Sequence, residues 1–176
     1  MNQPEILIVG AGGMGALFGS ILHENGLKVV LYDTNTEHIR AIQQAGLKIE
    51  GYGGDRTIPI AATSNLSELE SAEIIIFQCK SHGTRQAAKA VKPLITQKSV
   101  CISFQNGLGN EEVMAEELGE NSVMGGLTAM AGVLLEPGKI RDFSRVPSHI
   151  GEMRGGISER AQTIADRLSH TGLETH

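Results

Sequence analysis

The sequence is poor in aromatic and basic residues, which narrows the kinds of partner it can have. Its 176 residues include no tryptophan, two tyrosines and four phenylalanines, so it offers no stacking platform for single-stranded nucleic acid. The formal net charge is −5 and no cluster of lysine and arginine occurs, whereas nucleic acids and anionic membranes attract basic surfaces. We therefore expect neither a nucleic acid nor a membrane as a partner.

Cysteine and long apolar segments are scarce as well. The two cysteines, Cys79 and Cys101, each border an apolar run, so we expect buried free thiols rather than a disulfide. No segment approaches the ~20 apolar residues of a membrane-spanning helix. The first apolar run also lacks the basic flank of a secretory signal. Together these absences predict a cytoplasmic protein.

The sequence lacks the spacings of several common catalytic and metal sites. Six histidines are scattered through the chain without an H-x-x-x-H pair, and the two cysteines form no C-x-x-C pair. No G-x-S-x-G nucleophile turn is present. We therefore expect no metal site and no serine nucleophile.

A regular alternation of strand and helix signals is present instead. Short, nearly continuous apolar runs, typical of strands buried on both faces, alternate with segments that carry apolar residues at helical spacing. The predicted strands are Glu5–Val9, Lys28–Tyr32, Glu73–Phe77 and Ser99–Phe104, with a hairpin over Leu47–Ile60. This order predicts an α/β fold of Rossmann type, a doubly wound, mostly parallel sheet with helices on both faces.

After Ser122 the pattern changes. We expect two longer strands, Ser122–Leu135 and Ile140–Ile150, joined by a turn at Glu136-Pro137-Gly138. A last helix is predicted over Ser158–Ser169, with Ser158 as its cap. The total length and the apolar content of 40% suit a single globular domain.

The first predicted strand leads directly into a G-x-G-x-x-G sequence, Gly10-Ala11-Gly12-Gly13-Met14-Gly15. In dinucleotide-binding folds the first glycine permits a tight turn, the second lets the backbone approach the pyrophosphate, and the third lets the helix pack on the sheet. The N–H groups at the helix start, helped by the helix dipole, bind the phosphates. We therefore expect all six residues to contribute to the cofactor site of an NAD(P)-binding domain that spans residues 1–176.

Asp33 follows the second predicted strand, at about 20 residues beyond the glycines, where such folds place an acidic residue. A carboxylate there accepts hydrogen bonds from the ribose hydroxyls of NAD, and it repels the 2′-phosphate of NADP. Asp33 can instead simply cap the helix that follows, and that alternative stays open. We expect NAD as the cofactor, with NADP as the alternative.

Three further stretches lie where strands are predicted to end: Cys79-Lys80-Ser81, Gln105–Asn110 and Gly125-Gly126-Leu127-Thr128. Together with the glycine turn they resemble the ketopantoate reductases (2-dehydropantoate 2-reductases) and the related D-2-hydroxyacid dehydrogenases. The resemblance implies that Lys80 borders the cofactor near the nicotinamide and that Asn106 contacts the nicotinamide and the keto acid, which makes both catalytic candidates. Thr128 and Glu152 are weaker candidates. From the residues alone, Lys80 can also be a solvated surface lysine and Asn106-Gly107 a plain turn.

The sequence departs from this family in two respects. The NADP-dependent ketopantoate reductases carry an arginine just after the second strand, whereas this sequence has Asp33, which favours NAD. The family also has a helical second domain with a catalytic lysine and a substrate-binding glutamate, and we expect that domain to lie outside this chain and the chain alone to be inactive. The resemblance thus implies the N-terminal cofactor-binding domain of a 2-keto acid reductase. Its partner would be a small 2-keto acid, and a homodimer is one assembly to test.

Two other functions stay open at this point. A Rossmann module that senses a nucleotide without chemistry would share the fold, although it would not need the asparagine at position 106. The hydroxyisobutyrate and 6-phosphogluconate dehydrogenases begin with a similar glycine turn but fit the later stretches less well. Our leading expectation is hydride transfer between a nicotinamide and a 2-keto or 2-hydroxy acid.

Overall fold

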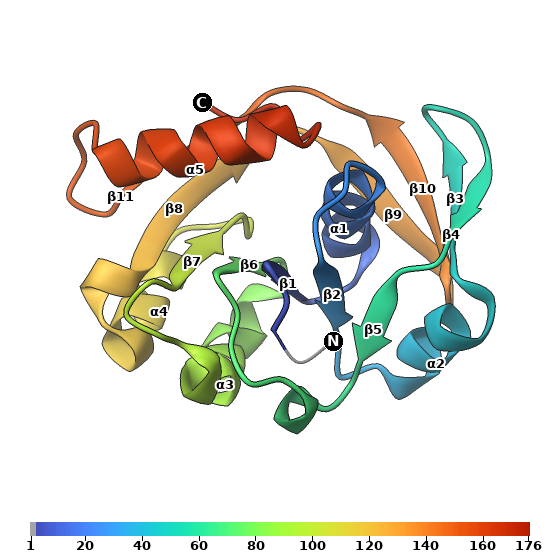
Figure 1. Cartoon of the computed structure of the whole chain (residues 1–176), viewed down its shortest axis with the longest axis horizontal. Helices are drawn as coiled ribbons and strands as arrows, with labels where there is room; N and C mark the ends of the chain where they lie inside the picture. The colour runs from blue at the N-terminus through green and yellow to red at the C-terminus, as the bar shows by residue number, and fades with distance from the viewer. Residues whose placement is uncertain (1–2) are drawn as a thin grey trace.

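The central element is a seven-stranded sheet, seen in a computed structural model that describes residues 3–176. Its strands are β1 (Ile6–Val9), β2 (Val29–Tyr32), β5 (Ala61–Thr63), β6 (Ile74–Phe77), β7 (Val100–Ser103), β8 (Val123–Thr128) and β11 (Ser148–Glu152). They lie side by side in the order β11-β8-β7-β6-β1-β2-β5 (Figure 1). Every neighbouring pair is parallel except β8 and β11, so the expected mostly parallel sheet is confirmed.

Helices cover both faces of this sheet, and the alternation of side chains along β1 shows why. Ile6 and Ile8 pack into a cluster that includes side chains of α1 (Gly13–Glu24) and α5 (Glu159–His170). Leu7 and Val9 point to the other face, into a second cluster with side chains of α3 (Thr84–Val91) and α4 (Asn110–Leu118). Because both faces are buried, the short strands are continuous apolar runs, as in other doubly wound sheets.

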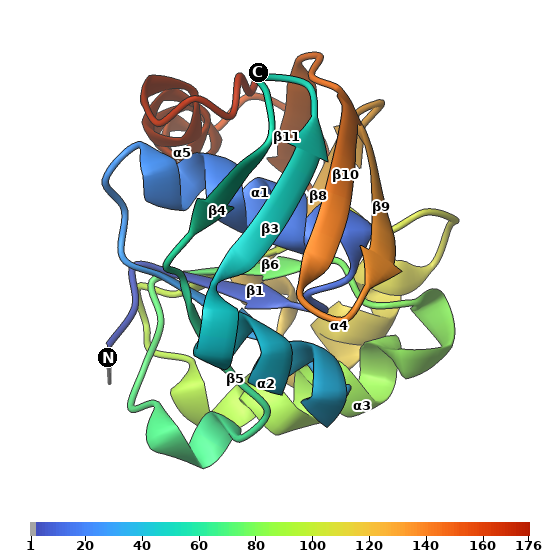
Figure 2. The ribbon, with the colours of Figure 1, turned by 90° about the vertical axis from the view of Figure 1, so that its right-hand side faces the viewer.

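A second, smaller sheet packs over α1. It contains β4 (Arg56–Ile58), β3 (Leu47–Gly51), β10 (Lys139–Ser144) and β9 (Ala131–Glu136), in that spatial order. Figure 2 shows these strands in front of α1, with α2 (Thr36–Ala45) below them. At the start of α1 the two backbones nearly touch, since a Cβ atom on Gly13 would lie 2.6 Å from the carbonyl oxygen of Gly132 on β9. The second sheet is thereby held close to the glycine turn.

The prediction of two long strands after Ser122 was wrong, because four strands occupy this region. β8 pairs with β11 in the large sheet, whereas β9 pairs with β10 in the small one. The four strands thus form one bent, two-stranded ribbon, with β8 and β9 on one arm and β10 and β11 on the other. Both arms bend at the same level, between the pairs Thr128–Ser148 and Ala131–Ser144. On one arm the Thr128 hydroxyl accepts a hydrogen bond from the Met130 N–H at 3.2 Å, which forms a turn. On the other arm a proline at position 147, which has no N–H group, interrupts the strand.

The remaining connections are short. The predicted hairpin is present as β3 and β4, but β5, which follows it, was not predicted and joins the edge of the large sheet instead. Residues 3–176 also contain four single 3₁₀ turns: η1 (Leu66–Glu68), η2 (Ser81–Gly83), η3 (Lys92–Leu94) and η4 (Glu120–Ser122). Within residues 3–176, no helix combines the length and the apolar character needed to cross a membrane.

Candidate functional site

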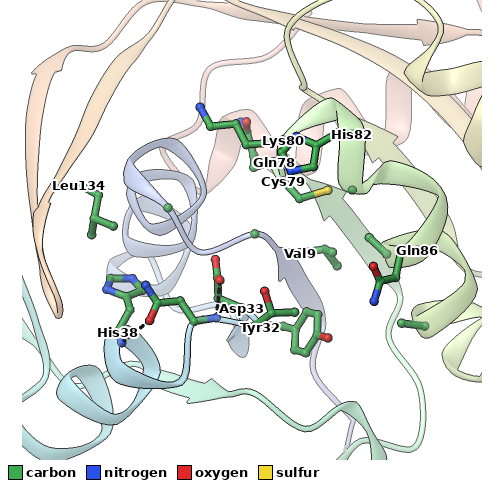
Figure 3. Close-up of a pocket in the computed structure, with 17 residues that line it drawn as sticks. Val9, Tyr32, Asp33, His38, Gln78, Cys79, Lys80, His82, Gln86 and Leu134 are labelled. Carbon is green, nitrogen blue, oxygen red and sulfur yellow. Dashed lines mark hydrogen bonds between the residues drawn. The ribbon is translucent and has the colours of Figure 1, made fainter.

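A cleft opens at the carboxyl ends of β2, β1 and β6. The chain leaves β1 toward β2 on one side and returns later to form β6 on the other side, so the strand order reverses at β1. Ligands of doubly wound sheets bind at such a reversal. The cleft has a volume of about 470 Å³ and is lined by Gly10, Gly12, Asp33, Cys79 and Lys80, among others (Figure 3).

The glycines of the turn differ in what surrounds them. Gly10 has a φ of 98°, and a Cβ atom there would overlap the backbone of Cys79. A Cβ atom on Gly15 would overlap the carbonyl oxygen of Gly10, so this glycine allows α1 to lie against the turn. At Gly12, by contrast, no atom lies within 4 Å of the position a Cβ atom would take. Gly12 is therefore the point at which the turn faces open space in the cleft.

The start of α1 is free of side-chain caps in the part of the chain that the structure describes. Its N-cap residue is Gly12, and no side chain accepts a hydrogen bond from the first turn. In α2 and α5, by comparison, Asn35 and Ser158 cap the first turn. The N–H groups of the first turn of α1 and the positive end of its dipole thus face the cleft at Gly12, which suits an anion.

The other residues of the turn make packing contacts rather than line the cleft. Ala11 is fully buried, Met14 packs against the core, and Gly13 contacts β9. The backbone of this turn is consequently fixed on three sides and open on the side of Gly12. A rigid turn with one open face can bind a ligand without reorganising.

Asp33 lies at the end of β2 and lines the cleft. Its Oδ1 atom accepts a hydrogen bond from the Asn35 N–H at 2.9 Å, which forms the turn into α2. The N-cap of α2 is Asn35, so the suggested capping role of Asp33 is limited to this preceding turn. Asp33 forms no ion pair within residues 3–176. A carboxylate oxygen of Asp33 therefore remains available to a ligand.

The charge of Asp33 affects its neighbours. Burial raises the pKa of Tyr32, and the negative charge of Asp33 raises this pKa further. Burial likewise raises the pKa of the Cys79 thiol, and Asp33 adds to the effect. Cys79 is half-buried and free, but at neutral pH it stays a thiol rather than a thiolate. We therefore assign Cys79 to the wall of the cleft and give it no nucleophilic role.

Lys80 follows β6 on the opposite side of the cleft from Asp33, and Figure 3 shows its side chain extended beside the glycine turn. It is exposed and forms no ion pair among the described residues. Lys80 is therefore the cation of the cleft that is free to meet an anionic group.

Asn106 lies in a neighbouring cleft rather than in the same one. This second cleft, of about 560 Å³, is formed by the loop after β7 and by β8 and β11, with Gly125, Gly126 and Leu127 in its wall. The structure thus brings Gly10, Gly12, Asp33 and Lys80 together in one cleft, and it places Asn106 in the adjoining one. The two meet where Gln105 reaches across to the Cys79 carbonyl oxygen at 2.8 Å.

The two weaker candidates have structural roles. The Thr128 hydroxyl accepts hydrogen bonds from the Met130 N–H and from the Ser148 hydroxyl. Glu152 forms an ion pair with Arg160, and this guanidinium holds the pKa of Glu152 below its usual range. Both residues stabilise turns around the sheet and are not part of the cleft.

His38 is a buried residue of the cleft wall that sequence reasoning did not single out. One ring nitrogen, Nε2, lies 2.8 Å from the carbonyl oxygen of Ala11, in the glycine turn. The other, Nδ1, accepts a hydrogen bond from the Gly138 N–H at 2.9 Å. The ring is therefore the tautomer with its proton on Nε2. Its place in the buried stripe of α2, with Ile39 and Ile42, was the available sequence signal.

Comparison with known proteins assigns the fold and its family. A family model described as ketopantoate reductase PanE/ApbA matches residues 6–155. Proteins named 2-dehydropantoate 2-reductase from Pyrococcus horikoshii and Lactococcus lactis are 35% and 31% identical, over 97% and 96% of this chain. The chain spans 55% of the length of each of these relatives.

Solved structures of similar fold include proteins with the same name as these relatives. A 2-dehydropantoate 2-reductase from Geobacter metallireducens superposes with a TM-score of 0.89 at 26% identity, over 97% of this chain and 56% of its own. A D-mandelate dehydrogenase, solved with NADH and anilino(oxo)acetate, superposes with a TM-score of 0.86 at 26% identity, over 97% of this chain and 55% of its own. The chain therefore belongs to the ketopantoate reductase PanE/ApbA family.

Proposed function

We propose that this chain forms the cofactor-binding part of an NAD-dependent 2-keto acid reductase. The observation that carries the proposal is the joint placement of an open glycine turn at Gly12 and a free carboxylate oxygen at Asp33 in one cleft. A dinucleotide has a pyrophosphate and an adenosine ribose that match these two features. The family membership and the D-mandelate dehydrogenase solved with NADH support the same cofactor.

The residues present fit the pyrophosphate end of such a cofactor. The absence of a side chain at Gly12 leaves room for a phosphate, and the uncapped first turn of α1 supplies N–H donors. A dinucleotide bound there would extend toward Asp33 on one side and toward Lys80 on the other, because both line the same cleft. Asp33 would accept hydrogen bonds from the ribose hydroxyls.

Asp33 also supports NAD over NADP. A 2′-phosphate at this position would meet a carboxylate that has no ion-pair partner within residues 3–176. Like charges at close range repel, and burial in a cleft strengthens the effect. The negative field of Asp33 already raises the pKa values of Tyr32 and Cys79, after the larger effect of burial.

We assign Lys80 and Asn106 to the reacting end. The nicotinamide, when bound, supplies a hydride to the keto carbon of the substrate or accepts one from the hydroxy acid. Lys80 is placed to attract an anionic carboxylate or phosphate, since it carries an unpaired positive charge beside the cleft. Asn106 can donate and accept hydrogen bonds through its amide, as a bound keto acid requires. The substrate class is thus a small 2-keto acid.

Equilibrium titration of the chain with NADH and with NADPH tests this proposal. The absence of tryptophan means that nicotinamide fluorescence can be followed with little background from the protein. The account predicts saturable binding of both reduced cofactors with a lower Kd for NADH. Tighter binding of NADPH would contradict the assignment of Asp33, and absence of binding would contradict the function. Because we expect the chain alone to be inactive, the assay that separates a reductase from a nucleotide sensor follows oxidation of NADH by a 2-keto acid in a version extended by the helical second domain.

Two further expectations belong to this proposal. Both cysteines are free, which suits a reducing compartment, so we propose a cytoplasmic location. The homodimer stays a prediction, and sedimentation of the purified chain over a range of concentrations would test it.

A further inference from the structure

Three buried polar side chains form a continuous chain of hydrogen bonds between the first turns of α3 and α4. They are Gln105, Thr84 and Asn110, with exposed fractions of 8%, 1% and 3%. Buried polar groups are costly unless they are paired, so three of them in one place call for an explanation. The proposed function uses none of them.

The bonds have a fixed direction. Gln105 Nε2 donates to the Cys79 carbonyl oxygen and to the Thr84 hydroxyl, both at 2.8 Å. The Thr84 hydroxyl donates in turn to Asn110 Oδ1 at 2.9 Å, and Asn110 Nδ2 donates to the Asn106 carbonyl oxygen at 3.2 Å. Because a carbonyl oxygen that can only accept lies at each end, neither amide can be reversed without placing two acceptors against each other.

This hydrogen-bond network ends on the two loops that carry Lys80 and Asn106, the residues assigned to the nicotinamide end. Cys79 precedes Lys80 in the loop after β6, and Asn106 lies in the loop after β7. The strands themselves stop pairing at Phe77 and Ser103, and one more backbone bond, from the Phe104 N–H to the Phe77 carbonyl oxygen, follows. Beyond that point, side chains rather than the sheet connect the loops.

We propose that Gln105, Thr84 and Asn110 are positioning residues that set the separation of Lys80 and Asn106. This inference rests on the proposed function, because it assigns both loops to the nicotinamide end. The adenosine end, at Asp33, makes no hydrogen bond to this network among the described residues. Loss of the network should therefore weaken binding of the nicotinamide half of the dinucleotide and leave binding of the adenosine half unchanged.

The chain offers matched variants for each bond. Thr84→Val removes the hydroxyl while keeping the branched shape, and Thr84→Ser keeps the hydroxyl. Gln105→Glu keeps the size of the side chain, but its carboxylate cannot donate to the Cys79 carbonyl oxygen. If the network positions the two loops, Thr84→Val and Gln105→Glu should weaken NADH binding to a similar extent. Thr84→Ser should bind NADH as the unmodified chain does.

The experiment compares binding of NADH with binding of ADP-ribose, which lacks the nicotinamide. We expect Thr84→Val and Gln105→Glu to raise the Kd for NADH about tenfold, the scale of an unsatisfied buried hydrogen-bonding group. The Kd for ADP-ribose should change less than about twofold, and Thr84→Ser should bind NADH with the Kd of the unmodified chain. Unchanged NADH binding in both variants, or equal losses for NADH and ADP-ribose, would overturn the inference while leaving the proposed function intact. Binding of neither ligand by the unmodified chain would overturn both.

Amide hydrogen exchange of the ligand-free protein provides a second readout that does not depend on binding. Thr84→Val should speed exchange at two hydrogen-bonded amides next to the network and leave the core strand β1 unchanged. They are Gly83, in the loop after β6, whose N–H donates to the Lys80 carbonyl oxygen at 2.8 Å, and Val113, whose N–H donates to the Gly109 carbonyl oxygen at 3.2 Å in the loop after β7. Exchange that is equally fast throughout would indicate general destabilisation and would contradict a local positioning role. Exchange unchanged at these two amides would contradict it as well.

Discussion

His38 and Gly138 are joined by a buried hydrogen bond of 2.9 Å although they are 100 residues apart in the sequence. The same imidazole contacts the carbonyl oxygen of Ala11 through its other nitrogen. A single side chain therefore connects the turn between β9 and β10 to the glycine turn after β1. Together with the close approach of Gly13 and Gly132, this contact fixes the small sheet against the cofactor cleft.

Replacing His38 tests this connection. His38→Leu should lower the free energy of unfolding by about 2 kcal/mol or more, because it leaves the Ala11 carbonyl oxygen and the Gly138 N–H buried without a partner. Urea unfolding followed by circular dichroism measures the change. His170→Leu, which alters an exposed histidine, is the control and should change stability by less than about 0.5 kcal/mol. Equal stabilities for the two variants would show that the His38 contacts contribute nothing.

Gly12 and Gly13 form a matched pair for the role of the turn. Gly12→Val should leave the fold intact, since no atom lies within 4 Å of its Cβ position, yet it should abolish NADH binding by filling the space for the pyrophosphate. Gly13→Val should instead lower the stability, by about 1–3 kcal/mol, since its side chain would overlap β9. Unfolding curves and NADH titrations of both variants measure these effects. If the Gly12 variant is native by circular dichroism and binds NADH as the unmodified chain does, the dinucleotide lies elsewhere.

Asp33→Asn tests the choice between the two cofactors. The amide keeps an Oδ1 acceptor for the Asn35 N–H, so the turn into α2 is preserved while the charge is lost. We expect NADH to bind more weakly and the preference for NADH over NADPH to narrow by about 1–2 kcal/mol, the scale of a charge-assisted hydrogen bond. Titrations of both reduced cofactors give the ratio of their Kd values. A ratio that stays at its original value would assign the preference to other residues.

Cys101 provides a prediction of pH dependence. Burial raises the pKa of its thiol from the ordinary value of 9.0 to about 12, so the folded protein holds this proton more tightly than the unfolded chain does. The resulting stability is complete below the unfolded pKa and is lost as the pH rises through the interval between the two values. Between about pH 8 and about pH 10.5, Cys101 should lower the free energy of unfolding by about 2 kcal/mol.

The quantity to compare is the slope of the free energy of unfolding against pH. Its value at a single pH would not serve, because Cys101→Ala also lowers stability by removing buried volume. Urea unfolding at several pH values should show a smaller loss of stability for Cys101→Ala than for the unmodified chain over this interval. Parallel curves for the two proteins would mean that the thiol titrates at its ordinary value in the folded state.

The sequence predicted those parts of the fold that depend on residues close to one another along the chain. A buried apolar strand, the glycine turn, an amphipathic helix and Asp33 follow one another within the first 33 residues, and each depends on its immediate neighbours. The parallel sheet and its two helical faces follow from the same alternation. Asp33 and Lys80 could be placed at the same edge of the sheet on that basis alone.

The remaining features depend on contacts between distant segments. The bend that divides the ribbon after Ser122 into β8 and β9 comes from a hydroxyl contact at Thr128 and from the facing interruption on the other arm. Period-two alternation identifies a strand but not the sheet that it joins. The hydrogen bond between His38 and Gly138 and the one between Gln105 and Cys79 cross intervals of 100 and 26 residues, and no spacing rule predicts them.

A crystal structure of the chain with bound NADH would show where each part of the dinucleotide lies. We expect the pyrophosphate beside Gly12, a ribose hydroxyl within hydrogen-bond distance of the Asp33 carboxylate, and the nicotinamide toward Lys80 and the loop of Asn106. Density for the pyrophosphate away from the glycine turn, or an adenosine ribose that makes no contact with Asp33, would contradict it.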